Sequence, residues 1–274
     1  MMSNTTSNPF QHEGAVPPDR LIGREKEVNI ILDLIANPAR GSSAIAGEQG
    51  IGKTSLLSHI SAPAVSRDWG LSPEWCSFIK IDCQTITSPT KITFWSKVLD
   101  TMERSPFDEE LRREYERLRA KDLITGFELR QLFDKFAEAN KLIVLLLDDF
   151  HWIIDHVNPD KPDLLNTMRS LINRPLRGLS IVITTPDPLD ALCNNIDFSG
   201  SPFQTSFAFV QLGPFTWDEA NELIDRALAS TEVRFTESDR RSVYEASKGH
   251  PARLQKACYD LFENYAKGSA DKGS

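Results

Sequence analysis

One stretch of the sequence, Gly47-Glu48-Gln49-Gly50-Ile51-Gly52-Lys53-Thr54, fits the pattern G-x-x-x-x-G-K-[ST] at every fixed position and decides the fold. Glycine residues allow the backbone to turn so that successive N–H groups point at phosphate oxygens. In such a loop Lys53 places a positive charge at the β- and γ-phosphates, and the Thr54 hydroxyl is a magnesium ligand. The alternative is a chance glycine turn, but the pattern arises by chance in on the order of one in a hundred chains of this length. The stretch, extended by Ser55, therefore predicts a nucleotide-binding loop.

The residues around this loop predict an α/β domain. Strands are expected at residues 43–46, 78–81, 142–147, 179–185 and 207–212, with helical patterns between them. The run at 142–147 is apolar throughout, which favours a strand buried on both faces. Five strands separated by helices indicate a parallel sheet with right-handed crossovers. We therefore expect the three-layer αβα fold of a P-loop NTPase with a parallel five-stranded sheet.

The chain divides into four segments. Residues 1–20 are rich in Ser, Asn, Thr and Pro, so we expect a flexible N-terminal arm that builds no core. Residues 21–213 form the α/β domain. After Pro214 the strands stop, and helices expected at 216–229, 237–247 and 251–265 make residues 214–266 a small helical lid subdomain. Residues 267–274 are expected to be a flexible polar tail.

The composition is that of a globular protein. The 274 residues are 40% hydrophobic and 26% charged, and 31 basic against 39 acidic residues give a net charge of −8. This balance does not favour nucleic acid or anionic lipid as a partner. The longest apolar run is far shorter than the ~20 residues of a membrane span, and the polar N-terminus does not resemble a signal peptide. The four cysteines form no CxxC pair, so neither a zinc knuckle nor a disulfide framework is indicated. We expect a cytoplasmic protein that does not contact a membrane.

Two adjacent acids, Asp148 and Asp149, follow the buried strand at 142–147. Asp148 is predicted to be the magnesium-side carboxylate of a Walker B element. Asp149 is predicted to orient or deprotonate the attacking water. The alternative is that the two acids cap the following loop. His151 and His156 come next, but their spacing matches no zinc pattern, and we assign them to a loop or helix surface.

Several motifs together resemble the STAND class of P-loop NTPases within the wider AAA+ group. These are Leu21-Ile22-Gly23-Arg24-Glu25, the phosphate-binding loop, and a Walker B element of DDxHW form at residues 147–152. Leu212-Gly213-Pro214-Phe215 and Gly249-His250-Pro251 resemble further elements of prokaryotic AAA-like ATPase domains. The resemblance covers residues 8–265, nearly the whole chain. The cofactors that it implies are ATP or ADP and Mg²⁺.

The resemblance also implies roles for residues outside the loop. The hhGRE element, with Ile22 and Arg24, packs near the adenine in this class. The GHP turn lies against the base or sugar, which implicates His250 and Pro251, and Arg253 corresponds to a sensor-2-like arginine. A simpler use of the same residues is that Gly249 ends one helix and Pro251 starts the next.

The chain departs from the class at two positions. Thr184 or Thr185 occupies the sensor 1 position, and Thr185 is the candidate to contact the γ-phosphate or the water. Many relatives have Arg at the next position, whereas this chain has Pro186. Many relatives also have Glu as the second Walker B acid, whereas this chain has Asp149. The shorter side chain reaches less far, so we expect hydrolysis of ATP to ADP and phosphate to be slow or dependent on a partner.

Two groups of basic residues have alternative interpretations. Arg169, Arg174 and Arg177 lie where AAA+ relatives can carry an arginine finger, although ordinary surface positions are favoured. The segment 111–121 carries five basic residues interleaved with acids. A nucleic-acid contact is conceivable there, but a solvated, ion-paired helix face is the better interpretation.

The sequence thus favours an ATP-dependent conformational switch that couples nucleotide state to self-association or to a separate effector or sensor protein. Two alternatives stay open: a nucleotide-holding adaptor with little turnover, and a DNA-associated AAA+ loader. The sequence does not name the signal, the effector or the oligomeric state. STAND relatives continue into a winged-helix domain and a sensor array. Neither fits after Tyr265, so we expect either a separate chain that supplies them or an origin as an excised domain.

Overall fold

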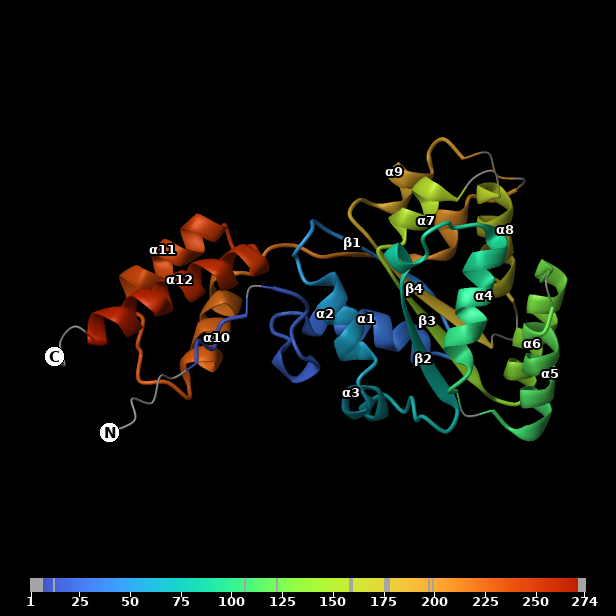
Figure 1. Cartoon of the computed structure of the whole chain (residues 1–274), viewed down its shortest axis with the longest axis horizontal. Helices are drawn as coiled ribbons and strands as arrows, with labels where there is room; N and C mark the ends of the chain where they lie inside the picture. Colours follow the sequence, from blue (N-terminus) through green and yellow to red (C-terminus); the bar gives the residue numbers. More distant parts are fainter. Residues whose placement is uncertain are drawn as a thin grey trace.

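The computed structural model describes residues 7–11, 13–105, 107–121, 123–157, 160–174, 178–196, 198 and 200–270. Figure 1 shows two parts, a sheet with helices on both faces and a group of three helices to one side. The expected α/β fold with a helical lid after it is confirmed.

Five parallel strands form the sheet in the order β2-β3-β4-β1-β5. Their bounds are Ser43–Ala46 for β1, Cys76–Asp82 for β2, Leu142–Asp148 for β3, Leu179–Thr185 for β4 and Ala208–Gln211 for β5. β3 and β4 are buried along their whole length, as expected for apolar strands inside a parallel sheet. Since all strands run the same way, the carboxyl ends of β1, β3 and β4 meet at one edge, where the side chains predicted to be functional gather.

Helices cover both faces of the sheet. On one face lie α1 (Glu25–Ala36) and α2 (Lys53–Ile60), flanked by α3 (Pro63–Asp68). On the other lie α4 (Lys91–Met102), α5 (Glu109–Arg119), α6 (Gly126–Glu138), α7 (His151–His156), α8 (Lys161–Ile172) and α9 (Leu189–Cys193). A hydrophobic core lies on each face of the sheet, and successive β3 residues point alternately into the two cores. Val144 and Leu146 face α1 and α2, while Leu145 and Leu147 face the other helical layer. Short 3₁₀ turns occur at Pro18–Arg20 (η1), Cys83–Thr85 (η2) and Phe203–Ser206 (η3).

The lid consists of α10 (Trp217–Leu228), α11 (Glu237–Ser247) and α12 (Pro251–Ala270). Capping boxes begin α10 and α11, where Thr216 and Thr236 exchange hydrogen bonds with the residue three positions later. Gly249 joins α11 to α12 with φ of 72°, and a Cβ there would lie 2.3 Å from the carbonyl oxygen of Phe215. This position therefore requires glycine. α12 continues to Ala270, so residues 267–270 are helical and the expectation of a flexible tail there is wrong. Residues 271–274 lie outside the described part of the chain.

The N-terminal segment differs from expectation. Phe10 is 3% exposed and lies in the lid core, stacked on Phe235 and edge-on to Phe262 with centroid distances of 5.7 and 6.3 Å. The Asn8 side chain donates hydrogen bonds of 3.1 Å to the Tyr259 carbonyl oxygen and 2.9 Å to the Glu263 carboxylate. The prediction of an arm that builds no core is thus wrong for the described part of this segment; residues 1–6 lie outside it.

We call residues 7–11 and 13–20 the N-terminal strap, because they connect the lid to α2. After Phe10 the strap reaches the α/β domain, where the backbone N–H of Val16 donates to the Ser55 hydroxyl at 3.1 Å. The Pro18 carbonyl oxygen lies 2.6 Å from the imidazole Nδ1 of His59. Figure 1 shows this dark-blue segment passing from the lid helices towards α2.

Loss of the Phe10 ring is expected to destabilise the lid. Phe10→Ala leaves a cavity among the lid helices and should lower the free energy of lid unfolding by about 3–5 kcal/mol. Hydrogen exchange of the α11 and α12 amides measures this effect, and the variant should exchange faster in both helices. Phe127→Ala is the matched control, because Phe127 is 62% exposed. Equal exchange in the two variants would mean that the strap does not support the lid.

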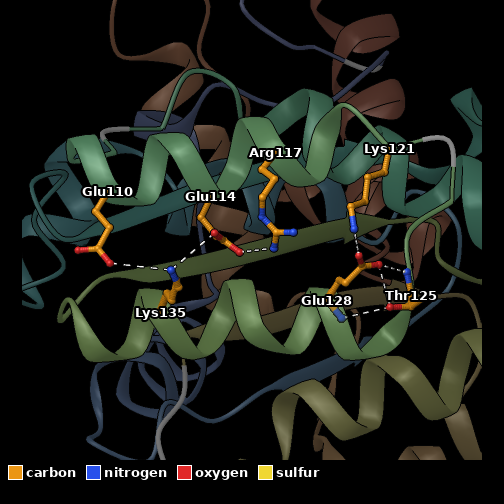
Figure 2. A network of polar contacts seen from close by, with 7 residues as sticks. All are labelled: Glu110, Glu114, Arg117, Lys121, Thr125, Glu128 and Lys135. Atoms are coloured by element: carbon orange, nitrogen blue, oxygen red, sulfur yellow. Dashed lines mark hydrogen bonds and ion pairs between the residues drawn. The ribbon is translucent and has the colours of Figure 1, made fainter.

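The basic residues of segment 111–121 are paired with acids and carbonyls. Figure 2 shows the ion pairs of Arg117 with Glu114, of Lys121 with Glu128, and of Lys135 of α6 with Glu110 and Glu114. The distances are 2.5 Å for Arg117–Glu114, 3.8 Å for Lys135–Glu110 and 3.6 Å for Lys135–Glu114. The hydrogen bond from Lys121 lowers the pKa of Glu128 to about 2. Arg119 contacts Asp100 and Glu103 of the α4 region. The interpretation as an ion-paired helix face is confirmed.

Two searches of the described residues give negative results. No helix among them is both long and apolar enough to cross a membrane. No group of three or more His, Cys, Asp or Glu side chains is arranged there to hold a metal ion.

Candidate functional site

The phosphate-binding loop connects β1 to α2. Gly50 and Gly52 have φ of 78° and 107°, a region that L-residues rarely adopt, so the turn depends on these two glycines. The Lys53 ammonium donates hydrogen bonds of 2.6 and 3.0 Å to the carbonyl oxygens of Gly47 and Glu48. Lys53 is 9% exposed, and burial lowers its pKa. Desolvation of this kind strengthens the attraction between an ammonium group and a bound anion.

A cavity of about 600 Å³ opens beside the loop. Four parts of the chain form its walls: the loop from Gln49 to Ser55, the strap with the hhGRE element, the carboxyl edge of the sheet, and the lid. The lining side chains outside the loop include Gln11, Val16, Ile22, Arg24, Gln84, Asp149, His151, Pro186, Phe215, Leu223, Pro251 and Gln255. The loop therefore gives the cavity a polar lining, and Val16, Ile22, Phe215 and Leu223 give it an apolar one. A mixture of this kind is typical of small-molecule sites.

Arg24 of the hhGRE element connects three segments. Its guanidinium donates to the carbonyl oxygens of Ile51 and Gly213 at 3.1 and 2.7 Å and lies 5.0 Å from the centroid of the Phe215 ring. Arg24 is 4% exposed, and burial lowers its pKa. Arg24 therefore fixes the loop relative to the linker that leads into the lid, in addition to lining the cavity.

Asp148 and Asp149, the acids predicted to form a Walker B element, lie at the end of β3, where Thr184 of β4 contacts both. The Thr184 hydroxyl donates to the Asp148 carboxylate at 2.7 Å and accepts from the backbone N–H of Asp149 at 2.9 Å. Asp149 has φ of 51°, a conformation that is uncommon for a residue other than glycine and is often found at functional sites. Burial and the neighbouring Asp148 raise the pKa of Asp149.

Thr185 does not fit its expected role as sensor. Its side chain is fully buried and donates a hydrogen bond of 2.7 Å to the carbonyl oxygen of Asp187. The hydroxyl of Thr185 is thus committed to its own loop, and the hydroxyl of Thr184 is committed to Walker B. Of the residues at this strand end, Pro186 lines the cavity.

Gln84 also lines the cavity, although no sequence motif marks it. It follows β2 in the turn η2, and its amide donates to Asp149 Oδ2 at 3.2 Å. The Asp82 carboxylate fixes this turn by accepting from the Gln84 backbone N–H at 2.9 Å. A polar residue two positions after a strand was the available signal, but only the strand order places the end of β2 beside the end of β3.

The structure brings the GHP turn onto the phosphate-binding loop. The His250 imidazole is 5% exposed, and its Nε2 lies 3.0 Å from the Gln49 carbonyl oxygen. A Cβ on Gly50 would lie 2.9 Å from the Cβ of Ala252. Arg253 is not among the residues that line the cavity; its guanidinium lies 3.8 Å from the Glu48 carboxylate, and its side chain is 63% exposed.

The arginines considered as fingers have structural partners where the structure describes them. Arg174 makes two hydrogen bonds to the Asp134 carboxylate, at 3.1 and 2.6 Å. Arg169 donates to the Ser201 carbonyl oxygen. Arg177 lies outside the described residues.

The residues predicted for magnesium fit a hard cation. Thr54 and Asp148 supply a hydroxyl and a carboxylate, the oxygen ligands that Mg²⁺ prefers. Thr54 lines the cavity. Asp148 uses Oδ1 for Thr184, so Oδ2 remains for a metal-bound water.

Removal of the Thr184 hydroxyl is expected to weaken the Walker B acids. In Thr184→Val, Asp148 loses a hydrogen bond and the Asp149 N–H loses its acceptor, at a cost of about 1–3 kcal/mol for each buried group left unpaired. We expect a higher Mg²⁺ requirement for nucleotide binding, measured by titration of the metal at constant ATP. Thr184→Ser keeps the hydroxyl and should behave like the wild type. A serine variant as impaired as the valine variant would contradict this role.

Comparison with known proteins identifies the family. A model of the AAA ATPase domain matches residues 20–182, more than half of the chain. The chain belongs to the AAA ATPase domain family. This AAA ATPase domain is therefore a nucleotide-binding AAA+ P-loop protein, in agreement with the resemblance drawn from its motifs at that coarser level. The search of curated proteins gives no match.

Solved structures share the fold of this AAA ATPase domain at low identity. The Walker-type ATPase of Pyrococcus abyssi has a TM-score of 0.65 at 15% identity, over 96% of this chain and 79% of that chain. Drosophila ORC bound to DNA has a TM-score of 0.65 at 15% identity, over 94% and 60%. The ADP form of Aeropyrum pernix ORC2 has a TM-score of 0.63 at 15% identity, over 95% and 67%. The chain spans only about three fifths of the Drosophila ORC chain, and all three likenesses concern the fold alone.

Proposed function

We propose that this AAA ATPase domain is an ATP–Mg²⁺-dependent conformational switch of the STAND type that hydrolyses ATP slowly. The observation that carries the proposal is the cavity shared by the phosphate-binding loop, the strap and the lid. A ligand in this cavity contacts all three at once. Its binding therefore favours one arrangement of the lid relative to the α/β domain.

Each part of the site has a role in this proposal. The N–H groups of residues 48–54 and the Lys53 ammonium bind the β- and γ-phosphates. The base lies between Ile22, Val16, Phe215 and Leu223, the apolar lining of the cavity. Thr54 and Asp148 hold Mg²⁺, which supplies positive charge to the phosphates when bound. Asp149 accepts the proton of the attacking water.

The contact between loop and lid explains how nucleotide state reaches the lid. His250 and Ala252 rest on Gln49 and Gly50, in the loop that the phosphates occupy. A change at the γ-phosphate alters the loop and hence the stability of this contact. Lid movement then exposes or completes a surface for a second copy or for a separate effector protein.

A nucleotide-holding adaptor is the second candidate. It is favoured by the Gln84–Asp149 hydrogen bond, which occupies one oxygen of the acid, and by Pro186 at the sensor 1 position. A DNA-associated role rests only on the fold of the ORC structures, and the net charge of −8 weighs against it.

The switch is tested by size-exclusion chromatography with light scattering in ADP and in a non-hydrolysable ATP analogue. We expect a larger mass with the analogue, and no such change in Lys53→Ala, which loses the phosphate contact. The same mass in both nucleotides would contradict self-association. If ATP binds tightly but no added partner stimulates phosphate release, the adaptor is favoured.

A further inference from the structure

His151 lies in the cavity beside Asp149 and has no role in the functions assigned above. We propose that His151 and Asp149 hold the attacking water between them, so that His151 is a catalytic residue of the hydrolysis. The inference rests on the proposed function, because it concerns the turnover of ATP bound at this site. The inference follows from two observations: one carboxylate oxygen of Asp149 already accepts a hydrogen bond, and His151 faces the other oxygen.

Two contacts fix Asp149, one at its backbone and one at its carboxylate. The backbone N–H is held by Thr184 at 2.9 Å, in the left-handed conformation with φ of 51°. Its Oδ2 accepts a hydrogen bond of 3.2 Å from Gln84. Among the described residues, these contacts leave Oδ1 as the oxygen that is available to a ligand.

His151 faces that oxygen. Its Nδ1 lies 3.9 Å from Asp149 Oδ1, which exceeds the range of a direct hydrogen bond. Nδ1 is buried and has no hydrogen-bond partner among the described residues, although the imidazole as a whole is 26% exposed. A buried polar atom of this kind needs a partner. A gap of 3.9 Å between two polar atoms is one that a single water bridges with normal hydrogen bonds.

The surroundings connect this pair to the phosphates. Gln84, Asp149 and His151 line the same cavity as Lys53, which is close enough to attract the Asp149 carboxylate. The other charged groups near the pair are Asp148 and Asp82, which belong to the same strand ends. His151 Nδ1 thus faces Oδ1, the oxygen of Asp149 that Gln84 does not contact, and in the proposal it carries the proton.

The step is the ordinary hydrolysis of the terminal phosphoryl group. The water accepts a hydrogen bond from His151 Nδ1–H and donates one to Asp149 Oδ1, which leaves a lone pair for attack. Its oxygen forms a bond to the γ-phosphorus while the bond from that phosphorus to the β–γ bridging oxygen breaks. The bridging oxygen keeps the electron pair and leaves with ADP. The proton of the water passes to Asp149 Oδ1 and from there to solvent. A second contact on the water compensates for the short side chain of Asp149.

The test compares His151→Ala, His151→Asn and His151→Gln in the full chain. Asn places a polar atom near the position of Nδ1, whereas Gln extends towards the position of Nε2. We expect kcat to fall on the order of tenfold to a hundredfold in the alanine and glutamine variants, with recovery in the asparagine variant. ATP and ADP affinities should stay unchanged, while the complex with ADP and aluminium fluoride should weaken in parallel with kcat. His156→Ala is the matched control on the same helix, since His156 stacks on Trp152 outside the cavity.

The outcomes separate this inference from the function on which it rests. Wild-type protein that does not bind ATP contradicts the proposed function itself. Binding without turnover contradicts the hydrolysis and the inference together. Measurable turnover that His151→Ala leaves unchanged overturns the inference alone. The inference alone is also overturned if all three variants lose ATP affinity or stability, because a structural role of His151 then explains their lower turnover. A double variant with Asp149→Asn should lose no more than the worse single variant, since both residues act on one water.

Discussion

Lys53→Ala is expected to weaken ATP binding about a hundredfold. The Lys53 ammonium is 9% exposed and lies inside the phosphate-binding loop, so it acts on a phosphate with little screening by water. A hydrogen bond between charged groups contributes about 1.5–3 kcal/mol, and each 1.4 kcal/mol changes an affinity tenfold. Equilibrium titration with a fluorescent ATP analogue measures the change.

Two comparisons give this result its meaning. Lys97→Ala removes the same charge from an exposed position of α4 and should bind ATP like the wild type. The unfolding transition of Lys53→Ala should be close to that of the wild type, because the hydrogen bonds of Lys53 within the described residues go to carbonyl oxygens of its own loop. Unchanged ATP affinity in Lys53→Ala would contradict the assignment of the whole site.

Asp149→Asn is expected to lower turnover on the order of a hundredfold while ATP affinity stays the same. The amide cannot accept the proton of the attacking water, and a positioned base contributes about a hundredfold or more. Asparagine adopts the left-handed conformation readily, so φ of 51° is no obstacle to the substitution. Steady-state phosphate release and direct ATP titration separate the two quantities.

The control for Asp149→Asn is another acid that contacts no part of the cavity. Asp163→Asn is such a variant, because Asp163 lies at the start of α8 and forms an ion pair with Lys91 on the surface. It should retain full turnover. Equal turnover in Asp149→Asn and wild type would show that Asp149 is not the base. A large loss of ATP affinity in Asp149→Asn would instead assign it to binding.

The fold and the phosphate end of the site were predictable because their signals are local. A fixed pattern of eight residues predicts the loop, and continuous apolar runs predict the central strands β3 and β4. The acids at the end of β3 follow from the direction of a parallel strand. No long-range contact has to be known for any of these steps.

The remaining parts of the site depend on contacts between distant segments. Phe10 lies in a polar segment, and only the lid residues Phe235 and Phe262 show why it is buried. Gln84 becomes a neighbour of Asp149 through the order of the strands. The choice between Thr184 and Thr185 depends on side-chain direction at the strand end, where Asp187 takes the hydroxyl of one and Asp148 that of the other.

Calorimetric titration of the wild-type chain with ATP and Mg²⁺ tests the central claim most directly. The account predicts saturable binding of one ATP per chain, which is weakened when Mg²⁺ is omitted and is lost in the Lys53→Ala variant at the same concentrations. The absence of saturable heat from well-folded protein, or binding that Lys53→Ala leaves intact, would contradict it.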